Sequence, residues 1–89
     1  MSQKGGDMPP VKMYTLSGCV HCKNTKQFLN ENGVKYEYID VDLLSGEEVT
    51  AMIEEVKQYN PAATFPTICI GNKVIVGFKK DEIKAALGI

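Results

Sequence analysis

The segment SGCVHCK, residues 17–23, holds two of the three cysteines of the 89-residue chain, Cys19 and Cys22. A Cys-x-x-Cys pair can bind a metal ion, form a structural disulfide or exchange electrons with other thiols, and the spacing alone does not decide among these. The residues before the pair predict a strand, and those after it predict a helix that leads to a second strand. This β-α-β context favours redox chemistry.

The start of a helix is a place where a cysteine ionises readily. The first N–H groups of a helix have no partners within it, and the positive end of the helix dipole lies there. Both favour a thiolate at Cys19, and the thiolate is the form that attacks. Cys22 follows by one turn on the same side, so it can attack the mixed disulfide on Cys19 and release the reduced product.

His21 lies between the two cysteines, and two interpretations of it are open. As a cation, its imidazole would stabilise the Cys19 thiolate and make the pair more oxidising. The alternative is an exposed residue at the helix start with no role. The third cysteine, Cys69, lies in the apolar segment TICI. We expect a buried and inert thiol there.

The first part of the chain predicts a β-α-β unit around the cysteine pair. Residues 11–16 (VKMYTL) and 36–42 (YEYIDVD) indicate strands because they are rich in β-forming residues. Residues 21–32 between them indicate a helix, and Gly33 supplies its left-handed stop. Such a unit implies two parallel strands joined by a right-handed crossover.

The second part of the chain predicts a helix, a hairpin and a last helix. Ser45 and Glu48 form a capping-box pattern. Behind it an apolar stripe has the spacing of one buried helix face: Val49, Met52, Ile53 and Val56. TFPTICI and KVIV, separated by a Gly-Asn turn, indicate a hairpin, and Gly88 closes the final helix. The order β-α-β-α-β-β-α predicts a four-stranded mixed sheet with helices on both faces.

Composition and charge restrict the classes of partner. The chain is 44% hydrophobic and 24% charged with a net charge of −1, which is ordinary for a globular domain. The balance argues against nucleic acid, and no apolar run approaches the ~20 residues that span a membrane. We expect residues 1–10 to form a flexible tail before a domain at 11–89. We also expect a monomer in the cytoplasm, where paired cysteines are more often catalytic or metal-binding than structural.

Three motifs in register resemble the glutaredoxins and glutaredoxin-like proteins of the thioredoxin superfamily. They are YTLSGCVHCKNTKQFL, TFPT and VGF, and the resemblance covers residues 11–87. It implies a thioredoxin fold and a thiol-disulfide oxidoreductase. Such a protein reduces disulfides in other proteins through a dithiol, with Cys19 as the nucleophile and Cys22 as the resolving cysteine.

The resemblance also implies a substrate-binding segment opposite the cysteines. Pro66 matches the family's cis proline, although only ~5–6% of X–Pro bonds in folded proteins are cis. The cis bond would hold the backbone of Phe65 exposed beside Cys19, where a substrate peptide could pair with it as an extra strand. The substrate-binding residues that follow from the resemblance are Thr64, Phe65, Pro66, Gly77 and Phe78.

The chain departs from the family where glutathione would bind. Leu16 occupies the position of a common lysine, and Lys79 and Lys80 occupy positions that are commonly acidic. A lysine cannot bind the ammonium group of glutathione, because like charges repel. Val20 and the basic segment after Gly77 instead resemble the redoxins that reduce ribonucleotide reductase and accept electrons from thioredoxin reductase. Glutathione and thioredoxin reductase both stay open as the external electron donor.

Two other functions could use the same cysteine pair. Small heavy-metal domains also place Cys-x-x-Cys between a strand and a helix, but they carry methionine where this chain has Gly18. Some glutaredoxins share an iron–sulfur cluster at a dimer interface with glutathione as an extra ligand, which the loss of glutathione contacts disfavours. We therefore predict no bound metal or cofactor. The expected partners are a disulfide-containing protein and either a reductase or glutathione.

Overall fold

The computed structural model describes residues 9–89. Most of the expected N-terminal tail, residues 1–8, lies outside the described residues. The elements, in chain order, are β1 (Val11–Thr15), α1 (Val20–Glu31), β2 (Glu37–Asp40), the 3-10 helix η1 (Val41–Leu43), α2 (Glu47–Tyr59), β3 (Thr67–Ile70), β4 (Lys73–Val76) and α3 (Lys80–Leu87). None of the helices within residues 9–89 is both long enough and apolar enough to cross a bilayer.

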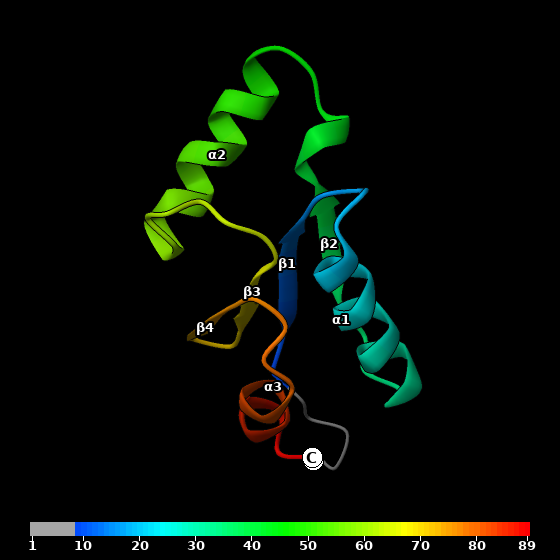
Figure 1. Ribbon diagram of the computed structural model, residues 1–89. Coiled ribbons are helices and arrows are strands. Elements are labelled where there is room, and N and C mark those ends of the chain that lie inside the picture. The colour runs from blue at the N-terminus through cyan, green and yellow to red at the C-terminus, as the bar shows by residue number, and fades with distance from the viewer. Residues whose placement is uncertain (1–8) are drawn as a thin grey trace.

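The strands form one mixed sheet in the order β2-β1-β3-β4. β1 is parallel to β2, with Thr15 opposite Asp40, and antiparallel to β3, with Tyr14 opposite Thr67. β3 and β4 form the hairpin across the Gly-Asn turn. The predicted order of elements and the four-stranded mixed sheet are confirmed. Since β1 and β2 run in parallel, their carboxyl ends lie at the same edge of the sheet, and Figure 1 shows the chain leaving β1 there to enter α1.

Each face of the sheet packs against helices. On one face, Met13 and Ile68 pack with Leu29 of α1 and Ile83 of α3, and all four are fully buried. On the other face, Tyr14 packs with the apolar stripe of α2, so the predicted inner face of that helix is confirmed. Only Val56 of this stripe is fully buried, and Val49, Met52 and Ile53 are half-buried. In Figure 1, α1 and α2 accordingly lie on opposite sides of β1. Fully burying one such aliphatic side chain contributes about 1.5–3 kcal/mol to folding.

Several local predictions need correction. The second strand is shorter than residues 36–42, because the chain turns into η1 after Asp40. The predicted capping box is wrong: Gly46 is the N-cap of α2, and no side-chain capping bond is present there. Ser45 acts through its backbone instead, since its C=O accepts a hydrogen bond from the N–H of Glu48 at 3.2 Å. At the other end of the expected tail, the C=O of Pro10 accepts a bond from the N–H of Gly71 at 2.9 Å.

A buried asparagine organises the loop between α2 and β3. The Asn60 residue is 6% exposed. Its Nδ2 lies 3.1 Å from the carbonyl oxygen of Thr64, 3.0 Å from Thr64 Oγ1 and 3.1 Å from Thr67 Oγ1. Thr67 Oγ1 in turn donates to the carbonyl of Thr64 at 2.8 Å. Asn60 therefore ties together the residues on both sides of the Phe65–Pro66 bond.

We expect Asn60→Ala to lower the free energy of unfolding by about 1–3 kcal/mol, because it removes the side-chain hydrogen bonds to Thr64 and to the buried hydroxyl of Thr67. Urea denaturation of both proteins measures this difference. Asn30→Ala, at an exposed position of α1, is the matched control and should change stability by less than about 0.5 kcal/mol. Equal effects of the two substitutions would show that Asn60 does not hold the loop.

Candidate active site

Cys19 and Cys22 lie at the junction of β1 and α1, as predicted. Cys19 is the N-cap of α1 and has an extended backbone, with φ −88° and ψ 120°. Its Sγ accepts a hydrogen bond from the backbone N–H of Cys22 at 3.3 Å. The first turn of α1 carries no acidic residue. A sulfur in this position receives both an N–H bond and the positive end of the helix dipole, and both stabilise a negative charge on it.

The two cysteines differ in exposure and in acidity. Both are reduced in this structure; Cys19 is half-buried, whereas Cys22 is fully buried. Burial, and to a lesser extent a side-chain hydrogen bond with Cys19, raise the pKa of the Cys22 thiol to about 12. Cys22 therefore remains protonated at neutral pH and can donate its S–H to Cys19. An accessible sulfur at the helix start and a buried thiol behind it are the arrangement that an attacking and a resolving cysteine require.

The turn before Cys19 is held by a carboxylate that sequence analysis did not identify. The N–H of Cys19 donates to the C=O of Leu16 at 3.2 Å, which places Ser17 and Gly18 at the corner of a turn. Asp42 accepts two bonds at this corner, from the N–H of Ser17 at 2.8 Å and from its hydroxyl. The bond from the Ser17 hydroxyl, and to a lesser extent the bond from the Ser17 N–H, hold the pKa of the Asp42 carboxyl below its usual range. β1 and β2 are parallel neighbours, so the residues that follow their carboxyl ends lie close together. This arrangement could have been used to predict the contact from the sequence.

The segment before β3 has the expected cis peptide bond, between Phe65 and Pro66. Because Tyr14 pairs with Thr67, this bond lies beside the end of β1 from which the chain leads to Cys19. The C=O of Pro66 accepts a hydrogen bond from the N–H of Gly77 at 2.8 Å. Two separate motifs of the sequence, TFPT and VGF, are thereby brought together next to the cysteine turn.

The other predicted site residues have different surroundings. Thr64 is exposed, but its C=O is occupied by Asn60 and Thr67. Phe65 is half-buried against the cluster under α2. The ring of Phe78 packs on the other face of the sheet, in the core between α1 and α3, with its centroid 6.0 Å from that of Phe28. His21 is exposed in the first turn of α1.

The structure also shows the surroundings of Leu16, Lys79 and Lys80, which differ from the residues expected in a glutathione-dependent glutaredoxin. Leu16 is half-buried and packs under α2. Lys79 is the N-cap of α3, and its Nζ lies 3.8 Å from the carboxylate of Glu82; both side chains are more than half exposed. Lys80 Nζ lies 5.5 Å from the centroid of the Phe28 ring. An exposed pair such as Lys79–Glu82 is weak, so the positive charge of Lys79 stays available to a partner.

Two features are separate from the cysteine turn. Cys69 is half-buried rather than fully buried as expected, because Lys12 and the exposed Val74 flank it on the neighbouring strands; burial still raises the pKa of its thiol. Within residues 9–89, no group of three or more His, Cys, Asp or Glu side chains is placed to hold a metal ion.

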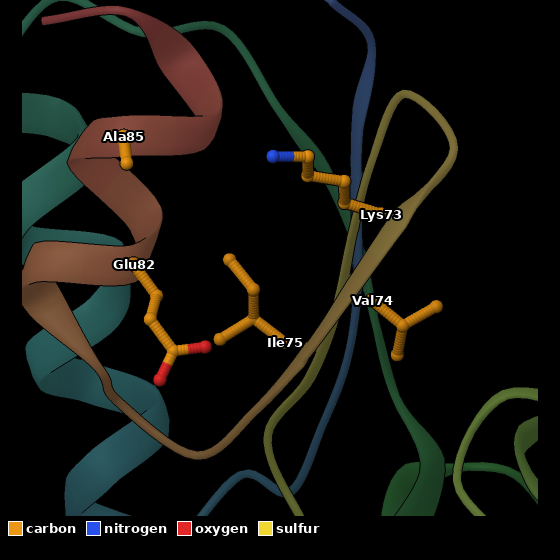
Figure 2. Close-up of a pocket in the computed structure, with 5 residues that line it drawn as sticks. All are labelled: Lys73, Val74, Ile75, Glu82 and Ala85. Carbon is orange, nitrogen blue, oxygen red and sulfur yellow. The ribbon is translucent and has the colours of Figure 1, made fainter.

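A shallow pocket of about 300 Å³ lies between β4 and α3, where Glu82 and Ala85 face Ile75 (Figure 2). It also includes Lys73, which pairs with Ile70 at the end of the sheet opposite Thr15. None of the predicted site residues lines this pocket. The pocket is therefore not part of the candidate active site.

The fold and the cysteine turn define a thioredoxin-fold protein with a thiol redox site. The family model for glutaredoxin matches residues 11–75, and the chain belongs to the glutaredoxin family. The chain is 30% identical over 73 residues to the glutaredoxin-like 8.6 kDa protein in the rubredoxin operon of Clostridium pasteurianum, covering 82% of this chain and 91% of the relative.

Solved structures of glutaredoxins have the same fold. The crystal structure of Methanosarcina acetivorans methanoredoxin superimposes with a TM-score of 0.86 and 46% identity, over 92% of this chain and 87% of that one. The buckwheat glutaredoxin–glutathione complex superimposes with a TM-score of 0.71 and 25% identity, over 90% of this chain and 71% of that one. The second protein is one that binds glutathione.

Proposed function

We propose that this glutaredoxin reduces disulfides in other proteins by a dithiol mechanism, with Cys19 attacking and Cys22 resolving. Thiol redox function follows from membership of the family. The observation that carries the finer assignment is the N-cap position of Cys19, whose sulfur accepts the N–H of Cys22 at 3.3 Å while Cys22 itself is buried.

The mechanism consists of two exchanges. The Cys19 thiolate attacks one sulfur of a substrate disulfide, so that a Cys19–substrate bond forms and the other substrate sulfur leaves as a thiolate that takes up a proton. Cys22 then loses its proton to solvent and attacks Cys19 Sγ, which forms the Cys19–Cys22 disulfide and releases the second substrate thiol. The substrate gains two electrons and the protein loses two. An external donor returns the pair to the dithiol form.

The substrate would bind across the segment that precedes β3. Among the described residues, the backbone N–H and C=O of Phe65 make no backbone hydrogen bond. An extended substrate segment could pair with them as an added strand, which would direct its disulfide at Cys19. Thr64, Pro66 and Gly77 would shape this strand site through the contacts that hold the cis peptide. In this proposal Phe78 supports the site from the core side.

Electrostatics favour a reductase over glutathione as the donor. Lys79 and Lys80 present positive charge beside Gly77, where the ammonium of glutathione would need a negative partner. Leu16 offers no charge to a glutathione carboxylate. We therefore propose that a thioredoxin reductase reduces the pair. We also propose that the protein works as a monomer in the cytoplasm, where thiols are kept reduced.

A coupled assay with a disulfide-containing protein such as insulin tests this function. We expect turnover with NADPH and thioredoxin reductase, and little with NADPH, glutathione and glutathione reductase. Cys69→Ser is the control variant and should be as active as the unmodified protein, because Cys69 lies on β3 outside the turn. If neither donor system supports reduction of the protein disulfide, the proposed function is wrong.

His21 provides a prediction on the reduction potential. If its imidazolium stabilises the Cys19 thiolate, His21→Gln should lower the potential of the pair, because it removes stabilisation of the reduced form. Redox equilibration detects the difference, because 30 mV corresponds to ~1.4 kcal/mol for two electrons. If His21→Gln and the unmodified protein have equal reduction potentials, His21 is a surface residue without this role.

A further inference from the structure

Two carboxylates from one short segment contact the chain around the cysteine turn. Asp40 is the last residue of β2, and Asp42 lies in η1 directly after it. Asp42 binds Ser17, two residues before Cys19, through the two bonds described above. Asp40 lies opposite Thr15 in the parallel pair of strands. The segment 40–42 therefore contacts the chain where β1 ends and where the turn begins.

Asp40 also contacts Lys26 of α1, which follows Cys22 in the chain. Its Oδ1 accepts a bond from the hydroxyl of Thr15, which is fully buried, and lies 3.4 Å from Lys26 Nζ. The side chains of Lys26 and Asp40 are only 22% and 15% exposed. Lys26 Nζ further lies 3.7 Å from the ring centroid of Tyr38. A carboxylate, an aromatic face and low exposure together restrict where the ammonium of Lys26 can lie.

Lys26 is well placed to act on Cys22. It follows Cys22 by four residues in α1, so both side chains leave the helix on the same face. The positive charge of Lys26 lowers the pKa of the Cys22 thiol, against the larger effect of burial. Resolution of a mixed disulfide requires the Cys22 thiolate, and a nearby cation stabilises a thiolate.

We propose, on the basis of the dithiol mechanism above, that segment 40–42 supplies one positioning residue for each of the two attacks. Asp42 fixes the Leu16–Cys19 turn and serves the attack of Cys19 on the substrate. Asp40 holds the ammonium of Lys26, which leaves α1 on the same face as Cys22, and serves the attack of Cys22 on the mixed disulfide.

Rapid-quench kinetics with a disulfide-bonded protein substrate separate the two steps, because mass spectrometry resolves the mixed disulfide from the products. We expect Lys26→Met and Asp40→Asn to slow resolution about three- to tenfold, with mixed disulfide accumulating on Cys19 and the first attack unchanged. Lys26→Arg keeps the charge and should restore resolution. Lys57→Met is the matched control, since the Lys57–Glu54 pair has the same 3.4 Å separation but lies exposed on α2.

The Asp42 variants should affect the other step. We expect Asp42→Ala to slow the first attack about three- to tenfold and to leave resolution unchanged, because the turn before Cys19 loses its anchor. Asp42→Asn removes the same charge but keeps an oxygen that can accept the N–H of Ser17, so it should retain most of the rate. A comparison of the two variants therefore separates geometry from charge.

The outcomes distinguish this inference from the proposed function. If the unmodified protein forms no mixed disulfide and releases no substrate thiol, both are wrong. If it turns over while Lys26→Met and Asp42→Ala match it in both steps, only the positioning roles are wrong. Slow resolution in Lys26→Arg equal to that in Lys26→Met would also overturn the role of the Lys26 charge. Equal losses in Asp42→Asn and Asp42→Ala would overturn the positioning role of Asp42.

Discussion

Replacing Cys19 by serine is expected to abolish disulfide reduction, with a loss of more than about a hundredfold in rate. A serine hydroxyl does not ionise at the helix start and cannot form the mixed disulfide. Cys22 cannot substitute for it, because that thiol is fully buried and its pKa is raised to about 12. The coupled assay on insulin measures the loss. The Cys69→Ser variant controls for the general effect of removing a thiol.

The Cys22→Ser variant should fail in a different way. Its Cys19 can still attack, so a mixed disulfide with the substrate should form and persist instead of resolving. Intact-mass analysis would show one substrate chain bound per protein. Iodoacetamide at neutral pH provides a second test, since Cys19 in Cys22→Ser should react much faster than Cys22 in Cys19→Ser. Equal reaction rates would contradict the assignment of the two roles.

Restoring the acidic segment at the start of α3 should create glutathione-dependent activity. The double variant Lys79→Asp with Lys80→Asp replaces two repelling charges by two that can bind the ammonium of glutathione. Hydrogen bonds to charged groups contribute ~1.5–3 kcal/mol each, or about ten- to a hundredfold in affinity. We expect glutathione-dependent turnover to rise by at least about tenfold, measured with glutathione reductase and a glutathione mixed disulfide.

The same double variant has a second consequence that needs a control. Lys79 is the N-cap of α3 and makes no side-chain capping bond, so an aspartate there should also stabilise the helix by about 0.5–2 kcal/mol. The variant Lys79→Ser with Lys80→Ser supplies the cap without the negative charge, and should gain much less glutathione activity. High glutathione turnover by the unmodified protein would contradict the charge argument.

The sequence was informative where a local pattern has one structural solution. The strand, the turn and the helical spacing predicted the N-cap position of Cys19, because these signals lie within a few residues of one another. The apolar stripe of α2 was equally local. The cis bond at Pro66 was different in kind: no nearby residue demands it, and only the resemblance to glutaredoxins implied it.

The contacts that the sequence did not predict join residues that are distant in the chain. Asp42 binds Ser17 across 25 positions, and this contact depends on the register of β1 against β2. Cys69 was expected to be buried from its apolar neighbours, but burial depends on what covers the strand, and the neighbouring Val74 on β4 is 39% exposed. The predicted capping box is absent because Gly46, with φ 59°, and not Ser45 is the N-cap of α2.

The central claim is that the Cys19–Cys22 pair carries two electrons to a protein disulfide. Its most direct test is a single turnover: the reduced protein is freed of reductant, mixed with excess insulin, quenched with acid and alkylated, and its peptides are mapped by mass spectrometry. We predict one Cys19–Cys22 disulfide for each insulin disulfide reduced, with Cys69 still alkylated as a free thiol. Insulin reduction without a Cys19–Cys22 disulfide, or oxidation that appears at Cys69 instead, would contradict the account.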